Sequence, residues 1–330
     1  MKRILITGAS GFIGSFLVEE AVNRNYETTA GIRKTSSRKY LQDNRIHFLE
    51  LDFQDKIKLK KQLLQAGKFD YIIHNAGLTK TCNTADFEQV NYINTRNFIE
   101  VLQENGQVPR KFIFISSLEA YGPGKAGTNI PVKDTDIPKP ATLYGKSKLK
   151  AEKYIKTLQD FPWLIMRPTG VYGPREKDYF LVFKSIKQGI ETYIGKTDQH
   201  LTFIFVKDLT RLLIDMLESD VLHRSYFGSD LKYYTSKQFN ELIKSELNKK
   251  TRIFHLPKSL VRMMAFVNGK LSCLLGKTPT LNPDKYYIIS QTNWLCDSRP
   301  LVTDFNFNPR YDLQKGVKET IKWYLNEAWL

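Results

Sequence analysis

The first 21 residues constrain the fold most strongly, because a short apolar strand runs through a glycine-rich turn into a helix. The strand is Arg3-Ile4-Leu5-Ile6, and glycines follow at positions 8, 11 and 14. An apolar helical face comes next, at Ile13, Leu17, Val18 and Ala21. Between a strand and a helix, three such glycines permit a tight turn, close approach of a phosphate to the backbone, and close helix–sheet packing. The free N–H groups of the first helical turn then bind anions, so this stretch predicts a dinucleotide phosphate loop.

Length, charge and cysteine usage limit the class of protein. At 330 residues the chain exceeds what one core usually serves, so we expect two lobes. No apolar run approaches the ~18 residues that span a membrane, and the N-terminus enters a strand at once, without a signal peptide. The net charge of +16 is spread along the chain without a nucleic-acid motif. Cys82, Cys273 and Cys296 lie scattered along the chain, without the spacing of a disulfide pair or of metal ligands. The sequence therefore predicts three free thiols, no metal site and a reducing cytoplasm.

The end of the second predicted strand, 26–32, bears on the choice of cofactor. In a dinucleotide fold this strand end lies beside the adenosine ribose, where an acid selects NAD and an arginine accommodates the 2′-phosphate of NADP. The chain has no acid there and continues with Arg33, followed by Ser36, Ser37 and Arg38. Arg33 therefore favours NADP, with NAD left open, although a plain basic surface loop is the alternative.

Tyr144 and Lys148 form the most specific chemical signal. With Ala151, Ile155 and Leu158 they make one helical stripe, which turns the lysine toward the sheet. A buried lysine is costly unless it has a partner or a task. A tyrosine that acts as a base near neutral pH needs its pKa of ~10 lowered by about three units, and a nearby ammonium supplies that shift. The pair therefore predicts proton transfer coupled to hydride transfer at a carbinol carbon.

Ser117 follows the predicted strand 111–115. Ligands of open parallel sheets bind beyond the carboxyl ends of the strands, so Ser117 is expected beside the nicotinamide. There its hydroxyl would bind the substrate oxygen and fix its geometry.

The order of these motifs resembles the extended short-chain dehydrogenase/reductase superfamily, which includes the NAD-dependent epimerases and dehydratases. Thr7 to Gly14 looks like its cofactor loop, Ser117 with Tyr144 and Lys148 like its catalytic centre, and Arg167 to Pro174 like its R-P-x-x-V-Y-G-P segment. The similarity covers nearly the whole chain and is closest to the 3β-hydroxysteroid dehydrogenase-like and dihydroflavonol reductase-like branches. It implies a Rossmann-type, doubly wound parallel α/β sheet with a smaller C-terminal α/β substrate lobe.

The resemblance also implies site residues. Those assigned to the cofactor are Thr7, Gly8, Ser10, Gly11, Phe12, Ile13, Gly14, Arg33, Asp52, Phe53, Asn75, Ala76, Gly77, Asn91, Tyr144, Lys148, Pro168 and Val171. Those assigned to the substrate are Glu119, Tyr172 and Arg175. Glu119 stands where dehydratase relatives carry an acid, whereas Leu118 replaces their other acid. A helix cap is the alternative role for Asp52, although Asp55 fits it better, and His74 is expected to be structural.

The second half carries fewer signals. Ser236 to Leu247 predicts an amphipathic helix, and Asp208 is expected to cap another helix. Residues 256–275 are unusually apolar. A core helix of the second lobe is the favoured interpretation. A wall of the substrate pocket, or a membrane-surface contact helped by Arg262 and Lys270, is the alternative.

These observations predict an NAD(P)-dependent oxidoreductase that acts on a small-molecule secondary alcohol or ketone. A nucleotide-sugar epimerase or dehydratase with tightly held cofactor is the first alternative, and an NADP-sensing regulator without turnover is the second. We expect residues 1–170 plus 201–228 to form the dinucleotide-binding domain, and 171–200 plus 229–330 to form the substrate domain. No nucleic-acid partner and no stable membrane insertion are expected, whereas peripheral membrane contact and a homodimer remain open.

Overall fold

A parallel seven-stranded sheet forms the centre of the computed structural model, which describes residues 1–330. In spatial order its strands are β11 (Arg224–Gly228), β6 (Trp163–Pro168), β5 (Lys111–Ile115), β4 (Tyr71–His74), β1 (Arg3–Thr7), β2 (Glu27–Ile32) and β3 (His47–Glu50). The strand order runs outward in both directions from the neighbouring strands β1 and β4. β2 and β3 follow on one side, and β5, β6 and β11 on the other, as in a doubly wound Rossmann sheet. The strands predicted at 3–6, 26–32 and 111–115 are therefore confirmed within one residue at each end.

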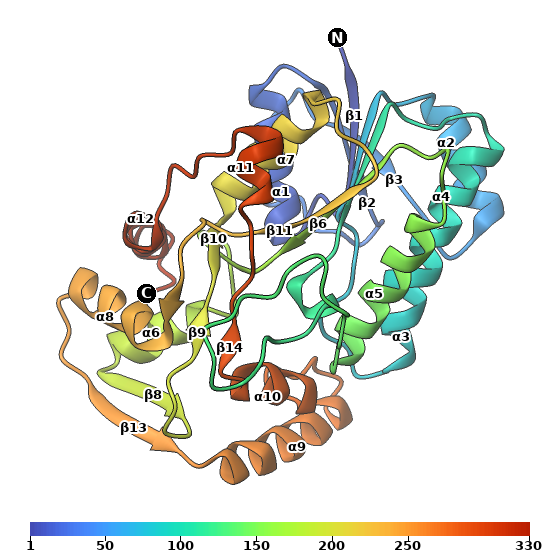
Figure 1. The fold of residues 1–330 in the computed structure, drawn as a ribbon. Coiled ribbons are helices and arrows are strands. Elements are labelled where there is room, and N and C mark those ends of the chain that lie inside the picture. Colours follow the sequence, from blue (N-terminus) through green and yellow to red (C-terminus); the bar gives the residue numbers. More distant parts are fainter.

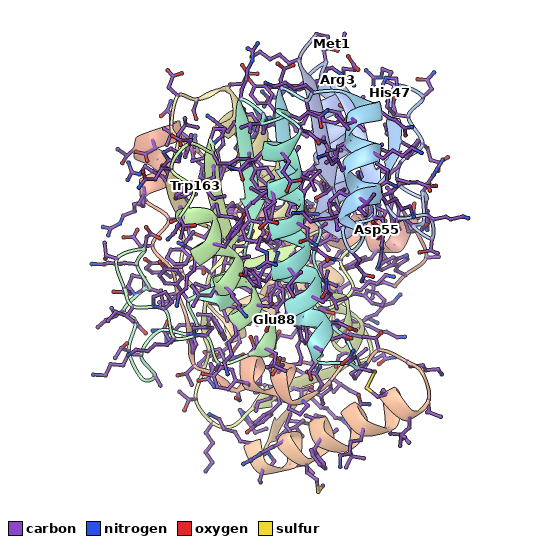
Figure 2. All side chains as sticks on the ribbon, turned by 90° about the vertical axis from the view of Figure 1, so that its right-hand side faces the viewer. Met1, Arg3, His47, Asp55, Glu88 and Trp163 are labelled. Carbon is purple, nitrogen blue, oxygen red and sulfur yellow. A yellow bond between two sulfur atoms is a disulfide. The ribbon has the colours of Figure 1, made fainter.

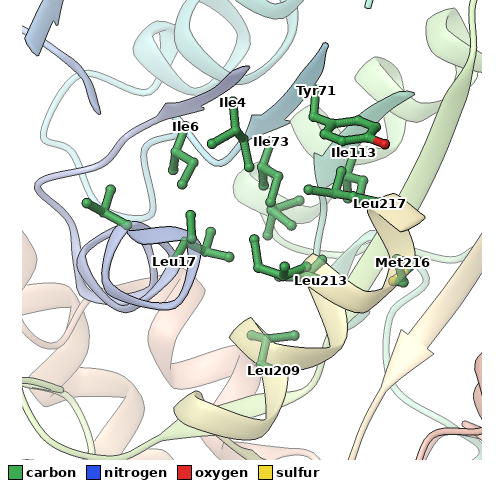
Figure 3. Packing of buried hydrophobic residues seen from close by; sticks show 14 of the residues in the cluster. Ile4, Ile6, Leu17, Tyr71, Ile73, Ile113, Leu209, Leu213, Met216 and Leu217 are labelled. Atoms are coloured by element: carbon green, nitrogen blue, oxygen red, sulfur yellow. The ribbon is translucent and has the colours of Figure 1, made fainter. Parts of the chain in front are cut away.

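Helices cover both faces of this sheet, because alternate strand residues point to opposite sides. On one face Ile4, Ile6 and Ile73 pack against α1 (Phe12–Asn23) and α7 (Val206–Glu218). Figure 3 shows this layer, with Leu17 of α1 and Leu213 of α7 facing the strands. The other face packs against three helices, namely α2 (Lys56–Ala66), α4 (Asn94–Glu104) and α5 (Leu143–Lys156).

The second half builds several small units below the carboxyl ends of the large sheet (Figure 1). Its strand pairs and small sheet comprise β7 (Gly170–Tyr172) with β10 (Phe203–Phe205), β8 (Ile190–Ile194) with β13 (Arg252–Leu256), and β9 (His200–Leu201) between β12 (Tyr234–Thr235) and β14 (Asn293–Trp294). The helices around them are α6 (Phe180–Lys187), α8 (Ser236–Leu247), α9 (Lys258–Leu274), α10 (Pro283–Ser290), α11 (Pro300–Phe305) and α12 (Leu313–Asn326). The predicted helix 236–247 is thus confirmed.

Short helical segments complete the chain order. They are α3 (Ala85–Glu88), the π-helix η1 (Gln89–Ile93) before α4, and the 3₁₀ turn η2 (Leu118–Ala120) after β5. None of the helices combines the length and the apolar character needed to cross a lipid bilayer.

The sequence suggested that Asp208 caps a helix, but in the structure it does not. α7 begins at Val206, so Asp208 lies inside its first turn and is 1% exposed. Its carboxylate accepts hydrogen bonds from the backbone N–H groups of Arg310 (3.1 Å) and Tyr311 (2.8 Å). The side chain therefore anchors the segment that leads into α12.

The prediction of three free thiols is wrong for two of the cysteines. Cys82 and Cys273 form a disulfide, with 5.5 Å between their Cα atoms and a sequence separation of 191. Figure 2 shows this bond in yellow beside α9. Cys296 is free and buried. The spacing of the cysteines could not predict this pair, because the two residues are far apart in the sequence. Only the fold brings the end of α9 beside the loop after β4.

The segment 256–275 is not a core helix. In α9 only Val261 and Ala265 are buried, and most of its large apolar side chains are exposed. No residue of this segment lines the large cavity described below, so the pocket-wall interpretation is wrong as well.

Candidate active site

A cavity of about 1410 Å³ opens along the carboxyl ends of the sheet strands. One end is lined by the glycine loop and the residues after β2 and β3, and the other by residues of α10 and the segment before it. It brings together 15 of the residues predicted for the site: Gly8, Ser10, Gly11, Phe12, Ile13, Arg33, Asp52, Phe53, Asn75, Ala76, Gly77, Ser117, Tyr144, Pro168 and Val171. Two residues predicted for the substrate, Glu119 and Arg175, also line it.

The glycine loop fits a bound pyrophosphate. Gly8 adopts a φ of +64°, which a side chain would strain. A Cβ on Gly11 would meet only the Gly8 carbonyl, at 3.2 Å, so a side chain there would grow into the cavity. No side chain caps the N-terminus of α1, which leaves the N–H groups of its first turn available to an anion. These features satisfy the requirements of a dinucleotide cofactor.

Gly14 and Thr7 support this loop from outside the cavity. A Cβ on Gly14 would lie 2.1 Å from the Gly8 carbonyl oxygen, so Gly14 is required for the contact between α1 and the loop. The Thr7 hydroxyl contacts His74 Nδ1 (2.9 Å) and accepts a hydrogen bond from the Ala76 N–H (3.1 Å). Both residues hold the loop in position and do not line the cavity.

The end of the cavity beside β2 carries basic residues. Arg33 is exposed at the end of β2, and its backbone N–H donates to Ser36 Oγ over 3.0 Å. Arg38 turns away and stacks on the Phe48 ring, 4.2 Å from its centroid, so it does not join Arg33. Asp52 lines the cavity and forms an ion pair with Lys58 (3.1 Å). The helix-capping role belongs to Asp55, as expected, since its carboxylate accepts from the Lys58 N–H.

His74 is a structural residue, as predicted. The ring is buried between the hydroxyls of Thr7 and Thr95, at 2.9 and 3.1 Å. Burial lowers the pKa of His74 to about 3, and the nearby Lys148 charge acts in the same direction. The imidazole is therefore neutral and fixes the end of β4.

Ser117, Glu119 and Tyr144 meet deep in the cavity. Ser117 Oγ accepts from the Glu119 N–H (3.1 Å) and shares a hydrogen bond with Tyr144. Thr142 caps α5 and donates its hydroxyl to the Glu119 carboxylate (3.0 Å). The helix start thus holds both the tyrosine and the acid against the end of β5.

The pKa values of this group differ from the expectation. Burial raises the pKa of Tyr144, and the Glu119 carboxylate raises it further, whereas the Ser117 hydrogen bond lowers it. Burial raises the pKa of Glu119 to about 7. The sequence had suggested that Lys148 lowers the pKa of Tyr144, but burial is the largest influence and raises it. Tyr144 is therefore a protonated phenol at neutral pH.

Lys148 is buried behind the cavity wall, one helical turn after Tyr144. Its Nζ donates to the Ile115 carbonyl (2.8 Å) and lies 4.7 Å from the centroid of the Phe114 ring. Burial lowers the pKa of Lys148 to about 8, while the Glu152 carboxylate raises it. The predicted burial of this lysine is confirmed, and its ammonium lies under the site next to Gly77.

Three residues expected to contact ligands have other partners. The Asn91 side chain accepts from the Leu78 N–H (2.7 Å) and donates to the Leu78 carbonyl and to Ser147, so it fixes the loop after β4. Tyr172 is 1% exposed in the core beside α12, outside the cavity. Arg175 lines the cavity, but its terminal nitrogens donate to Ser15 (2.9 Å) and Glu19 (2.6 Å) of α1, and its guanidinium stacks on Phe16.

The sequence reasoning missed a charged cluster at the substrate end. Asp178 bonds to Lys80 and lies 3.1 Å from Lys285, and all three line the cavity. It also missed the buried pair of Arg167 and Glu152, at 2.7 Å, which joins β6 to α5 behind Lys148. No local sequence pattern indicated the charged cluster. Glu152, in contrast, lies four residues after Lys148, one turn further along α5, and could have been noticed.

The parallel sheet and the glycine loop are those of a dinucleotide-dependent α/β enzyme, and Ser117 and Tyr144 lie in the cavity that this loop borders. The family model for the NAD dependent epimerase/dehydratase family matches residues 4–226. The chain belongs to this family, and it is an enzyme of the extended short-chain dehydrogenase/reductase superfamily.

The family's members with which this chain shares its full length differ in activity. The chain is 27% identical to UDP-N-acetyl-alpha-D-glucosaminuronate decarboxylase of Bacillus cytotoxicus, with 98% of both chains covered. It is 25% identical to the vaccinia virus 3 beta-hydroxysteroid dehydrogenase/Delta 5-->4-isomerase, covering 98% of this chain and 99% of the viral protein. The structure of UDP-glucose 4-epimerase from Thermotoga maritima superposes with a TM-score of 0.80 at 20% identity, covering 99% of both chains. That superposition supports the fold.

Proposed function

We propose that the protein reduces a ketone to a secondary alcohol with NADPH as hydride donor, or runs the reverse oxidation. The observation that carries this proposal is the placement of Ser117 and a protonated Tyr144 together in the cavity that the glycine loop borders. The similarity to a hydroxysteroid dehydrogenase, whose name describes oxidation of a ring hydroxyl, supports the same reaction type.

The nicotinamide, when bound, supplies or accepts the hydride. The Ser117 hydroxyl orients the substrate oxygen, and Tyr144 donates the proton that this oxygen needs as it gains negative charge. Lys148 provides positive charge beneath the tyrosine, and Glu152 holds that lysine in its charged form. Pro168 and Val171 form the wall that faces this centre from β6 and β7.

We propose NADP(H) as the cofactor because Arg33 stands at the cavity and no acid ends β2. Asp52 and Phe53 would contact the adenine, and Asn75, Ala76 and Gly77 the adjoining ribose. We also propose the two domains at the boundaries predicted from the sequence, a small-molecule substrate held at the α10 end of the cavity, and a homodimer.

We propose the cytoplasm as the place of this reaction, as expected from the sequence. The Cys82–Cys273 disulfide counts against that location, since reducing compartments keep such pairs open.

Nucleotide-sugar epimerisation or dehydration is the second candidate, and Glu119 favours it. This acid lies two residues after Ser117, and its pKa of about 7 suits proton exchange near neutral pH. An epimerase returns its hydride to the same substrate, so it shows no net change in cofactor.

Turnover with a panel of ketones and nucleotide sugars tests the two functions. We expect NADPH absorbance at 340 nm to fall in step with the alcohol formed from a ketone. An isomerised or dehydrated sugar without net cofactor change would replace the proposal by the second candidate. Tight NADP binding without turnover on either panel would support a sensor instead.

A further inference from the structure

The outer side of α9 presents an apolar stripe to solvent. Its members recur at intervals of three and four residues, which places them on one side of the helix: Leu260, Met263, Met264, Val267, Leu271 and Leu274. Val267 is 55% exposed and Leu274 is 84% exposed, whereas Val261 and Ala265 face the protein. A surface helix normally turns its polar side outward. In α9 the apolar stripe is exposed as well, which leaves a large apolar surface without a partner in the chain.

The neighbouring strand and loop add further exposed apolar side chains. Ile253 and Phe254 of β13 are 55% and 48% exposed, and Leu275 follows the end of the helix. We call the α9 stripe, these three residues and Phe266 the α9 face. In Figure 1 it lies at the lower edge of the molecule, with α9 outside α10 and β13 beside it.

The chain segment that carries the α9 face is basic. Between Leu247 and Pro283 the chain has no Asp or Glu, and it has seven basic residues: Lys249, Lys250, Arg252, Lys258, Arg262, Lys270 and Lys277. Lys270 Nζ lies 4.5 Å from the centroid of the Phe266 ring, and Arg262 is exposed without an ion-pair partner. An apolar stripe flanked by cations matches the interface of an anionic bilayer, where side chains enter the acyl boundary and cations meet the headgroups.

The inner side of α9 is fixed close to the active site. A Cβ on Gly269 would contact Asn282 and Pro283 at the start of α10, and Cys273 is bonded to Cys82. In turn, the Asp284 carboxylate of α10 accepts a hydrogen bond of 2.9 Å from the N–H of Leu143. Leu143 directly precedes Tyr144. Residues of α10 and the segment before it line the cavity. The α9 face therefore lies one helix layer away from the substrate end.

We propose that the α9 face docks the protein on the surface of an anionic membrane. A second copy of the chain is a poorer occupant, because a two-fold contact would place seven basic residues of each copy opposite those of the other. Docking brings the α10 end of the cavity to the lipid surface, where a membrane-resident amphiphile would enter. This last consequence rests on the proposed function, whereas the docking does not.

Co-sedimentation with vesicles tests the docking, with the full chain and no substrate. The probes are vesicles of phosphatidylcholine with 30% phosphatidylglycerol and vesicles of phosphatidylcholine alone. We expect sedimentation with the anionic vesicles and a loss of more than about tenfold in partition for Val267→Glu/Leu271→Glu. Arg262→Gln and Lys270→Gln should each weaken anionic binding about fivefold. The matched control is Ile57→Glu, on α2, where an 85% exposed side chain should not matter.

Three results would overturn the proposal. The first is no binding to anionic vesicles, and the second is equal loss in the Ile57→Glu control. The third is a dimer in solution that Val267→Glu/Leu271→Glu converts to monomer without any vesicle binding by the parent, which would assign the face to a second copy. Titration of NADP to each variant reports that the fold is intact, and the result is independent of whether the protein reduces a ketone.

Discussion

Tyr144 is the residue whose chemistry is most directly testable. Tyr144→Phe removes the hydroxyl that would donate the proton, so we expect turnover to fall by about 10²–10⁴-fold. The phenol is not a main phosphate contact, so the Kd for NADP should stay nearly unchanged. Steady-state kinetics and a fluorescence titration on one preparation provide both values. Turnover within a few-fold of the parent would exclude the proposed mechanism.

Arg33 decides cofactor preference if the assignment to NADP is right. Its guanidinium would hold the 2′-phosphate by charge-assisted hydrogen bonds, which contribute about 1.5–3 kcal/mol. We therefore expect Arg33→Ala to weaken NADP binding about ten- to a hundred-fold and to leave NAD binding almost unchanged. Dissociation constants for both cofactors measure this, and Arg38→Ala is the control because Arg38 stacks on Phe48. Equal weakening of NAD and NADP would contradict the assignment.

Through its charge, Glu119 is expected to influence the pKa of Tyr144 and with it the pH dependence of the reaction rate. Its carboxylate raises the tyrosine pKa, and its own pKa is about 7. Alcohol oxidation needs the phenolate, so its rate rises with pH through the tyrosine pKa. Glu119→Gln removes the negative charge, and the rise should move to lower pH by roughly one unit. Below about pH 7 the parent acid is itself protonated, so the two profiles should converge there. A profile that is unchanged or shifted to higher pH would refute the coupling.

At the scale of elements, two glycines at the start of α1 are expected to serve different purposes. Gly11 leaves room for the cofactor, and Gly14 allows the helix to pack on the glycine loop. Gly11→Val places a branched side chain in the space of the pyrophosphate, so we expect NADP affinity to fall by at least about 100-fold while the fold persists. Gly14→Ala is the matched variant, because its Cβ would lie 2.1 Å from the Gly8 carbonyl. That clash should lower the free energy of unfolding by about 1–3 kcal/mol. Urea unfolding and NADP titration of both variants distinguish these effects. Parental affinity in Gly11→Val would mean that phosphates bind elsewhere.

At the scale of the whole molecule, the disulfide joins the two halves of the chain. Thiol titration of denatured, unreduced protein should count one thiol, Cys296, and three after reduction. The bond closes a loop of 191 residues, so Cys273→Ser should lower the free energy of unfolding by about 3–5 kcal/mol. Three thiols before reduction would show that the pair is open in the purified protein.

Local sequence patterns were enough to predict the parallel sheet, and they also predicted the proximity of Ser117 and Tyr144 and the burial of Lys148. The strands β1, β4, β5 and β6 are largely apolar runs bounded by polar turns, and such runs need both faces covered. The glycine spacing and the stripe of Tyr144 and Lys148 are local patterns whose geometry follows from a turn or a helix. In this part of the chain Ser117 follows closely after β5, and Tyr144 begins α5 one turn before Lys148.

Only the tertiary structure decided the contacts between segments far apart in sequence. Arg175 looked available to substrate, yet α1 lies against it and satisfies its charge. The raised pKa of Tyr144 depends on burial and on Glu119, which no spacing predicts. Cys82 and Cys273, and the outward turn of α9, follow from packing between elements nearly two hundred residues apart. Apolar periodicity states which residues share a face of a helix, but it does not state which face the rest of the chain covers.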